Sequence, residues 1–507
     1  MKIAVWFQEE IMKGKINIFV YWQYGVNTRE FEKLLTDLNV EKCAYLYESS
    51  KDYIRSSRFI PLYLYNNIDF YKEAEIKNEL DDEIINKMLP YEHTGMDIVN
   101  RWHRSYSSKD DYSTIKEIYY IFLRFWNDFI IKNKIKLLVL NIVPHVPAEY
   151  IPYALCKAYS IPTIIQGVVP FTMGEKTNYI IKPDVESLDF NMFSRYQNIV
   201  ETYGDSDTKI LLSKEMERYF DQYDPKGKTD KKVIYYNEKN SVWDIFLAYF
   251  SRAKIYLRRM DYGILLKKAR YLVKARIESK LLLHQVAKLE ETPDLSKKYY
   301  IFGLHLQPEA TTLPTGGVFA NQLLAIRMIS KYLPKDTYLY VKEHPSYWIQ
   351  KGRLESIYES RNKDFYNCIK KLRNVVLIDH EISSAMLLDR CMAVVTITGT
   401  IGFEAIFKGK PVLAFGPTFY EFFPGVFRIK TNEDCCKAIE NISIHKYSYN
   451  QRQVAMYLKA LEKYIVPMGM NEKNFTDNGV PAVDSMDRIT MVRKILQFYE
   501  EYYRSKR

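Results

Sequence analysis

The sequence lacks the cysteine and histidine spacings that mark metal sites and disulfide frameworks. It has six cysteines in 507 residues, with no C-x-x-C pair and no zinc-like spacing to histidine. An H-E-x-x-H motif and clustered carboxylates are missing as well. We therefore expect no metal cofactor. We also expect reduced, buried thiols at Cys43, Cys156, Cys368, Cys391, Cys435 and Cys436.

Long apolar runs are also missing. The best stretches, 118–131 and 137–143, are short or broken by charge, and neither reaches the roughly 18 residues of a membrane span. The N-terminus turns acidic at Glu9 and Glu10 and has no apolar core of a signal peptide. These absences predict a cytoplasmic protein.

The chain does contain enough apolar surface for more than one core. At 507 residues it is too long for a single core, and two to three domains are expected from its length. Its content of 47% hydrophobic and 15% aromatic residues excludes wholesale disorder.

The positive charge gathers in one segment. The formal net charge is +11, and residues 252–288 hold eleven Lys or Arg against two acids, Asp261 and Glu278. Apolar residues recur between these charges at helical spacing, which is typical of a basic amphipathic helix on an anionic membrane surface. A helix with a solvated charged face is the alternative. Nucleic acid is not expected, because zinc-finger, helix-turn-helix and ribonucleoprotein motifs are missing.

The most informative segment is 393–416. Ala393 to Ile397 predicts a buried parallel strand, and the turn Thr398-Gly-Thr-Ile-Gly402 leads into a helix whose first backbone N–H groups can face an anion. Glu404 would then lie near a bound ribose. A tight strand-to-helix turn with packing glycines is the alternative from this segment alone.

Two more predicted strands, within 299–306 and 338–343, end in polar residues. The polar residues at or just after these strand ends are His305, Gln307, Glu309, Lys342 and His344. In a parallel sheet such ends meet at the carboxyl edge, where ligands bind in open α/β folds. Three polar strand ends together predict a binding site more strongly than the single turn does.

These motifs resemble the bacterial capsule and surface-polysaccharide synthesis proteins, a group that includes the β-Kdo transferases. The matching elements are Gln307-Pro-Glu309, Lys342-Glu-His-Pro345, 398–405, 409–412 and 416–420. The resemblance covers residues 298 to 425, and the N-terminal third only in pattern. It implies a glycosyltransferase of the GT-B fold that uses a nucleotide sugar such as CMP-Kdo.

Alternating strand and helix patterns agree with that fold. We expect an α/β, GT-B-like chain with two Rossmann-like lobes, parallel sheets and a helical insertion between them. The expected parts are an acceptor lobe at 1–190, a helical basic insertion at 191–297, a nucleotide-sugar lobe at 298–470, and a closing helix within 471–507.

In the second lobe, sugar transfer needs groups that stabilise the departing phosphate. The expected nucleotide-sugar ligands are His305, Gln307, Lys342, Thr398, Gly399, Thr400, Gly402 and Glu404. We expect His344 to add positive charge at the phosphate, with a plain turn as the alternative. Glu309 is expected at the site, either as an acid/base, as a contact to a substrate hydroxyl or as a cap. This arrangement would need no metal ion.

The first lobe is expected to hold the acceptor. Predicted strands at 135–141 and 161–167 flank a helix from Pro147 to about Tyr159, which places His145 and Glu149 near one sheet edge. Glu149 is the candidate base and His145 its substitute, while capping roles stay equally open. The resemblance implies retention through a carboxylate nucleophile, and no residue of this chain maps onto that nucleophile.

Three functions remain open. The favoured one is a CMP-Kdo-like transferase that builds capsule or lipopolysaccharide on a saccharide or glycolipid acceptor, with the segment 252–288 against the inner membrane. The second is another GT-B enzyme, such as a UDP-sugar transferase, a UDP-GlcNAc 2-epimerase relative or a polyol-phosphate polymerase. The third is a non-catalytic scaffold for polysaccharide assembly.

Overall fold

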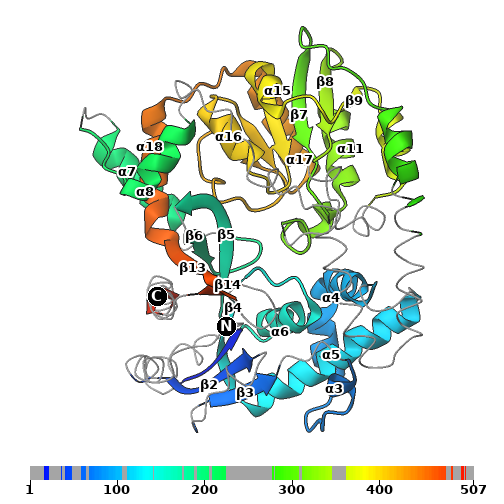
Figure 1. The fold of residues 1–507 in the computed structure, drawn as a ribbon, viewed down its shortest axis with the longest axis vertical. Helices are drawn as coiled ribbons and strands as arrows, with labels where there is room; N and C mark the ends of the chain where they lie inside the picture. The colour runs from blue at the N-terminus through cyan, green and yellow to red at the C-terminus, as the bar shows by residue number, and fades with distance from the viewer. Residues whose placement is uncertain are drawn as a thin grey trace. The chain divides into compact units, whose positions relative to one another are not determined.

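The computed structural model divides the chain into two compact units, residues 1–219 with 455–507, and residues 220–454 (Figure 1). The described residues are 16–21, 36, 40–47, 57, 59–63, 68–104, 111–140, 142–173, 176–187, 191–204, 208–223, 274, 277–278, 280–307, 311–344, 361–475, 481–483, 493–495 and 497. Glu309 and most of the basic segment 252–288 lie outside them.

The second unit is built on a six-stranded sheet in which all strands are parallel. The strands are β7 (Lys298–Gly303), β8 (Thr337–Lys342), β9 (Val375–Ile378), β10 (Ala393–Thr396), β11 (Val412–Ala414) and β12 (Val426–Arg428). Their spatial order is β12-β11-β10-β7-β8-β9. Counted from β7, this is the order 3-2-1-4-5-6 of dinucleotide-binding folds, in which the strand order reverses between the first and fourth strands.

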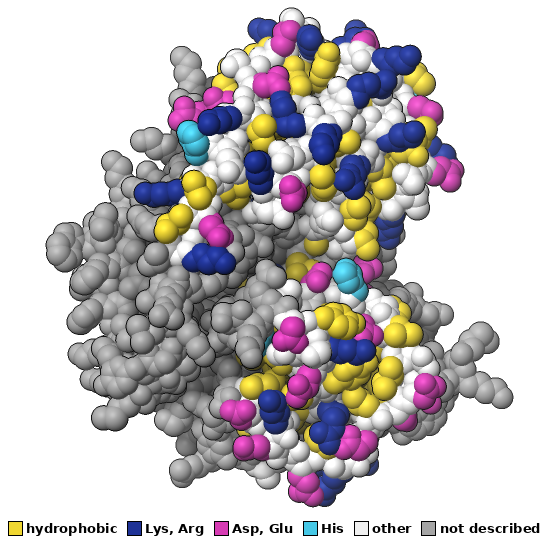
Figure 2. Space-filling model, turned by 90° about the vertical axis from the view of Figure 1, so that its right-hand side faces the viewer, with side chains coloured by type: hydrophobic (Ala, Val, Ile, Leu, Met, Phe, Trp, Pro, Cys, Tyr) yellow, Lys and Arg dark blue, Asp and Glu magenta, His cyan; other side chains and the backbone are white. Residues whose placement is uncertain are grey.

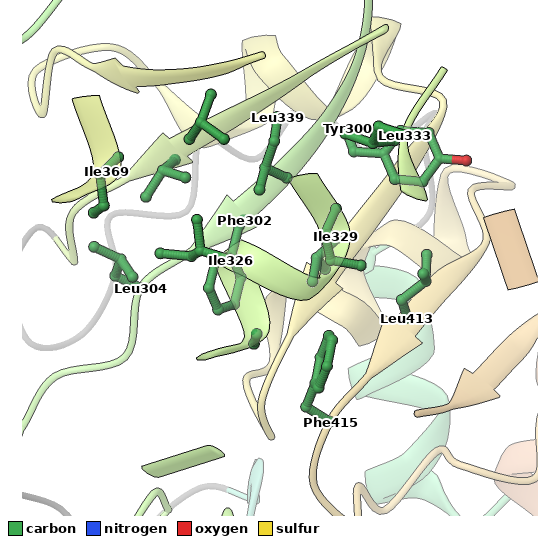
Figure 3. Packing of buried hydrophobic residues seen from close by; sticks show 14 of the residues in the cluster. Tyr300, Phe302, Leu304, Ile326, Ile329, Leu333, Leu339, Ile369, Leu413 and Phe415 are labelled. Carbon is green, nitrogen blue, oxygen red and sulfur yellow. The ribbon is translucent and has the colours of Figure 1, made fainter. Parts of the chain in front are cut away.

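Helices cover both faces of this sheet. On one face lie α11 (Gln322–Tyr332), α14 (Lys363–Lys370) and α17 (Asn432–Ile444). On the other lie α15 (Ser384–Arg390) and α16 (Ile401–Phe407), while the 3-10 turn η3 (Gly317–Ala320) precedes α11. Figure 3 shows side chains of β7, β8 and α11 pointing toward one another in the core.

The strand sequences are continuously apolar because both sheet faces are buried. In β7, Tyr300 and Phe302 face the core under α11, and both are completely buried. The alternate residue Tyr299 donates its hydroxyl to the carbonyl of Leu387 in α15, 2.9 Å away. Each such fully buried apolar side chain contributes about 1.5–3 kcal/mol.

The first unit holds an eight-stranded mixed sheet. Its strands are β1 (Ile16–Tyr21), β2 (Val40–Tyr47), β3 (Phe59–Tyr63), β4 (Ile135–Leu140), β5 (Thr163–Met173), β6 (Lys176–Lys182), β13 (Ile465–Phe475) and β14 (Pro481–Val483). The run β3-β2-β1-β4-β5 is parallel, and β6, β13 and β14 extend it by antiparallel pairing.

The helices of the first unit include α3 (Ile68–Lys72), α4 (Asp82–Arg104), α5 (Tyr112–Lys132), α6 (Pro147–Ala158) and α7 (Met192–Tyr203). Of these, α5 has a side-chain cap and a buried aromatic face. Asp111 caps α5 by accepting the Thr114 N–H at 2.8 Å. The buried Trp126 of α5 stacks on Phe19 of β1, with ring centroids 5.4 Å apart.

The chain returns from the second unit to the first near residue 455. Helix α8 (Lys214–Tyr223) and helix α18 (Gln451–Leu461), followed by η4 (Glu462–Tyr464), contain the two unit boundaries. Tyr457 of α18 packs on Tyr196 of α7 at 5.1 Å between ring centroids, and β13 then pairs with β6.

The expected α/β class with two Rossmann-like lobes is confirmed. Of the expected helical insertion, α7, α8 and the helical residues 280–287 are described. Of the expected closing helix, residues 493–495 and 497 are described, and they are helical. The antiparallel strands of the first sheet were not expected.

No helix in the described part of the chain is long and apolar enough to cross a membrane. On the face drawn in Figure 2, the described Lys and Arg side chains are interspersed with acidic and apolar ones. All six cysteines are free. Four are buried as expected, whereas Cys368 and Cys436 are partly exposed.

Candidate functional site

The carboxyl ends of β7 and β10 meet at the point where the strand order of the second sheet reverses. His305 follows β7, and Thr398 follows β10. The Thr398 backbone N–H donates to Nε2 of His305 at 3.0 Å, so the two loops are joined directly. Ligands of doubly wound sheets bind outside the carboxyl ends of the strands, at the point where the strand order reverses.

His305 is a neutral, fixed acceptor at this junction. Its ring is almost completely buried, and burial lowers its pKa to about 3, with smaller contributions from His344 and Arg361. Because Nε2 accepts the Thr398 N–H, the ring proton lies on Nδ1, which has no partner among the described atoms. Gln322 holds the backbone of His305 through two hydrogen bonds of 2.8 and 3.2 Å. His305 therefore shapes the turn and carries no positive charge.

The turn after β10 uses several of its donors internally. The Gly399 N–H donates to Oγ1 of Thr396 at 2.8 Å, and the Thr398 hydroxyl donates to the carbonyl of Thr311 at 2.6 Å. The N–H groups of Thr400 and Ile401 have no acceptor within the described residues, and Thr400 is exposed. The backbone N–H groups left for an anion are thus those of Thr400 and Ile401. Thr398 and Gly399 were also expected to bind the ligand, but their N–H groups are used inside the protein.

Gly402 is required by packing. A Cβ atom built at this position would lie 2.3 Å from the hydroxyl oxygen of Tyr420. Tyr420 is completely buried, and its hydroxyl donates to the carbonyl of Gly399. At this residue the structure therefore agrees with the alternative of a packing glycine.

A buried ion pair holds the carboxyl end of β8 and the loop after β7 together. Glu343 accepts the His344 N–H and the Tyr366 hydroxyl, both at 2.8 Å, and pairs with Arg361. Arg361 also donates to the carbonyl of His305. Glu343 and Arg361 are 1% and 4% exposed. The sequence motifs predict site residues on either side of Glu343, namely Lys342 and His344. They do not predict Arg361, because its role depends on contacts with residues far away in the sequence.

His344 lies at this end of β8 and is half-buried. Burial lowers its pKa below the ordinary value, Glu343 opposes the shift, and Arg361 and Lys342 add to it. The ring is therefore mainly neutral near pH 7. It would contact a phosphate as an N–H donor before any proton is taken up.

Lys342 turns toward the end of β9. Its ammonium group donates to the carbonyl of His380 at 3.0 Å, and the residue is 3% exposed. Burial lowers the pKa of Lys342, although Glu343, Glu290 and Asp379 oppose that shift. The amino group is thus held by the protein, away from the turn at Thr398.

Two further predicted residues lie near the turn. Gln307 donates one N–H of its side-chain amide to the carbonyl of Ala320 at 2.6 Å, so one of its two amide donors is already used. Glu404 is half-buried on α16, and its charge is one of the smaller influences that raise the pKa of Tyr420. Glu309 lies outside the described residues.

In the first unit, His145 and Glu149 form the start of α6. The Glu149 carboxylate accepts the N–H groups of His145 and Val146 at 2.8 and 3.4 Å, and Glu149 is 1% exposed. Its Oε2 is also 3.1 Å from Nδ1 of His145. Burial by itself lowers the pKa of His145, but Glu149 raises it above the ordinary value. Arg101 donates to the carbonyl of His145.

Hydrogen bonds thus connect Thr398 with His305 and, through Arg361 and Glu343, His305 with the backbone of His344. Gly399 and Thr400 directly follow Thr398 at this sheet edge. Lys342 is on the β9 side of this edge. His145 and Glu149 belong to the other unit.

Comparisons with known proteins agree with the resemblance on these motifs. Residues 283–455, which include all six strands of the second sheet, match the family described as capsule polysaccharide biosynthesis protein. The match confirms the resemblance to capsule synthesis proteins. No curated protein matches the chain.

Solved structures show more distant likenesses. The β-Kdo 2,7 transferase KpsC from Thermosulfurimonas dismutans is 12% identical, with a TM-score of 0.27 over 74% of this chain and 88% of that one. A UDP-GlcNAc 2-epimerase from Methanocaldococcus jannaschii is 11% identical, with a TM-score of 0.25 over 89% and 99%. The fold is therefore identified from the strand order of the two sheets.

Proposed function

We propose that this chain, which matches the capsule polysaccharide biosynthesis family over residues 283–455, is a glycosyltransferase that uses a nucleotide sugar. The single observation that carries the proposal is the coincidence of that family match with the bonded loops at the reversal point of the second sheet. The acceptor is a capsule or lipopolysaccharide saccharide, and a lipid-linked form of it fits the same chemistry.

The donor we favour is a CMP-linked sugar of the Kdo type. Transfer breaks the bond between the anomeric carbon and the phosphate oxygen, so negative charge grows on the departing CMP. The backbone N–H groups of Thr400 and Ile401 and the neutral ring of His344 are the donors proposed to stabilise it. Glu404 is proposed to accept ribose hydroxyls. The proposed transfer includes no step that uses a metal ion.

The acceptor hydroxyl must lose a proton as the new glycosidic bond forms. Glu309 is the proposed acid/base in the second unit. In the first unit Glu149, with His145 as its substitute, remains the candidate predicted from the sequence. Its contacts at the start of α6 make capping the competing role.

The first test is a thermal-shift panel with CMP, CDP, UDP, GDP and buffer alone. A ligand at about 100 times its dissociation constant adds about 2.7 kcal/mol to the free energy of unfolding, which is easily detected. We expect a selective rise with CMP, followed by turnover of CMP-Kdo. A selective rise with UDP would replace the CMP donor by a UDP sugar, and turnover of that sugar without an acceptor would indicate an epimerase. No rise with any nucleotide would contradict the proposal and favour a scaffold.

The second test is His344→Ala. Loss of a donor to the departing phosphate should reduce turnover by about 100-fold or more while the melting temperature stays near that of the wild type. His445→Ala is the matched control, because His445 is an exposed histidine of the same unit that follows α17. Equal activity of wild type and His344→Ala would remove His344 from the mechanism.

A further inference from the structure

Glu290, Asp379 and His380 form a cluster beside the carboxyl end of β9. Asp379 and His380 directly follow β9, whereas Glu290 precedes β7 in the chain. The two segments are joined by backbone hydrogen bonds. The Glu291 N–H donates to the carbonyl of Leu377 at 2.8 Å, and the Asp379 N–H donates to the carbonyl of Glu291 at 3.2 Å. The three side chains are therefore brought together by the backbone, independently of their own attraction.

The donor atoms of this cluster are spaced like the ligands of one ion. Nδ1 of His380 is 2.9 Å from Oε2 of Glu290 and 3.7 Å from Oδ1 of Asp379. All three donor atoms lie within 4.8 Å of one another. Tetrahedral ligands bound at about 2.1 Å stand about 3.4 Å apart. The two measured separations lie on either side of that value.

The three side chains of the cluster differ in their exposure to solvent. The side chains of Glu290, His380 and Asp379 are 5%, 31% and 40% exposed. The Glu381 N–H donates to Oδ1 of Asp379 at 2.9 Å, which orients that carboxylate as outer contacts do at metal sites. Water has access on the Asp379 side and can complete the coordination.

The charges around the cluster are consistent with a bound cation. Burial raises the pKa of Glu290 above its ordinary value; His380 opposes the shift, and Asp379 and Glu343 add to it. A cation beside Glu290 would relieve this cost. Lys342 is the opposing charge, but its ammonium group is bonded to the carbonyl of His380, and burial lowers its pKa.

We propose that Glu290, Asp379 and His380 bind a divalent transition-metal ion of the Zn²⁺ class. One imidazole and two carboxylates suit Zn²⁺ or Mn²⁺, whereas Mg²⁺ and Ca²⁺ prefer oxygen ligands alone. The ion joins the segment before β7 to the end of β9 and takes no step in the proposed transfer. The sequence motifs predicted no metal site because Glu290 and His380 are 90 residues apart.

The test is equilibrium dialysis of the metal-stripped full-length chain against ZnCl₂, MnCl₂ or MgCl₂. Cys368 and Cys436 are replaced by Ser, because these partly exposed thiols could bind zinc themselves. We expect saturable binding of one Zn²⁺ per chain, weaker binding of Mn²⁺ and none of Mg²⁺. Glu290→Gln and His380→Ala should each weaken the Zn²⁺ affinity at least about tenfold, since even outer-shell changes have such effects.

The matched control is the pair His93 and Asp97 on α4, an exposed histidine and carboxylate 3.7 Å apart. Its double variant His93→Ala/Asp97→Asn should bind Zn²⁺ like the parent. If Glu290→Gln does not fold, Asp379→Asn replaces it, because that side chain is the most exposed of the three. Absence of saturable Zn²⁺ binding, or equal affinity in parent and cluster variants, would overturn the proposal.

Discussion

At the scale of single residues, burial decides which polar groups of the site remain available to a ligand. His305 is held neutral because its ring is buried, and its Nε2 accepts a backbone N–H of the turn. The N–H groups of Thr398 and Gly399 are likewise used inside the protein. The N–H groups of Thr400 and Ile401 have no acceptor within the described residues and are the donors of the turn that can face a phosphate.

Gly402→Ala tests the packing role of the turn. The added methyl group would collide with the hydroxyl of the fully buried Tyr420, and overpacking of this kind costs about 1–3 kcal/mol. We expect that loss in the free energy of unfolding, measured with urea. Tyr420→Phe in the same chain should recover part of it.

The control for that substitution is Gly303→Ala on β7, where a Cβ atom would meet only Ile401, at 3.4 Å or beyond. It should cost clearly less than Gly402→Ala. Equal losses at the two positions would contradict the packing explanation.

At the scale of elements, the start of α6 explains the burial of Glu149. Helix N-termini leave backbone N–H groups without partners, and a carboxylate in the first turn can accept them. Glu149 does so for His145 and Val146, the residues directly before the helix. The proximity of His145 and Glu149 that the sequence predicts is therefore also what a cap requires.

Two variants separate a cap from a catalytic base. Glu149→Ala leaves a buried N–H unpaired and should lower the free energy of unfolding by about 1–3 kcal/mol. Glu149→Gln keeps an acceptor, so a capping role predicts a smaller loss of stability and near-normal turnover. A base role would instead require turnover to collapse in the Gln variant.

The Glu149→Gln variant also tests the effect of the Glu149 charge on the pKa of His145. Glu149 raises the pKa of His145 against the opposing effect of burial. Removing the charge should therefore lower the pKa of His145, which NMR titration of the ring can measure. An unchanged pKa would show that the contact between the two side chains does not persist in solution.

At the scale of the whole molecule, the chain forms two units, each with its own sheet, and returns to the first unit at its end. The pairing of β13 with β6 joins residues 465–469 to residues 176–180. The uneven charge is the other large-scale feature, because residues 252–288 carry much of the excess.

Charge reversal in that segment tests the membrane interpretation. A basic amphipathic helix binds anionic lipid through its cations. Release from anionic liposomes in a flotation assay is expected after changing four residues to Glu: Arg258, Arg259, Lys267 and Lys268. The matched control reverses four exposed lysines elsewhere: Lys331, Lys335, Lys430 and Lys446. Equal liposome binding of parent and the first variant would discard the membrane interpretation.

The sequence by itself determined β7, β8 and β10 of the second sheet and the polar residues that follow them. Apolar runs such as 393–397 and the turns that follow them are local signals, and the family motifs lie in the same segments. Only the tertiary structure decided the partners of those polar residues. Arg361 reaches both Glu343 and His305, and Glu290 meets His380 across 90 residues of chain. Burial and partner choice depend on which segments fold against one another, and no local pattern encodes that.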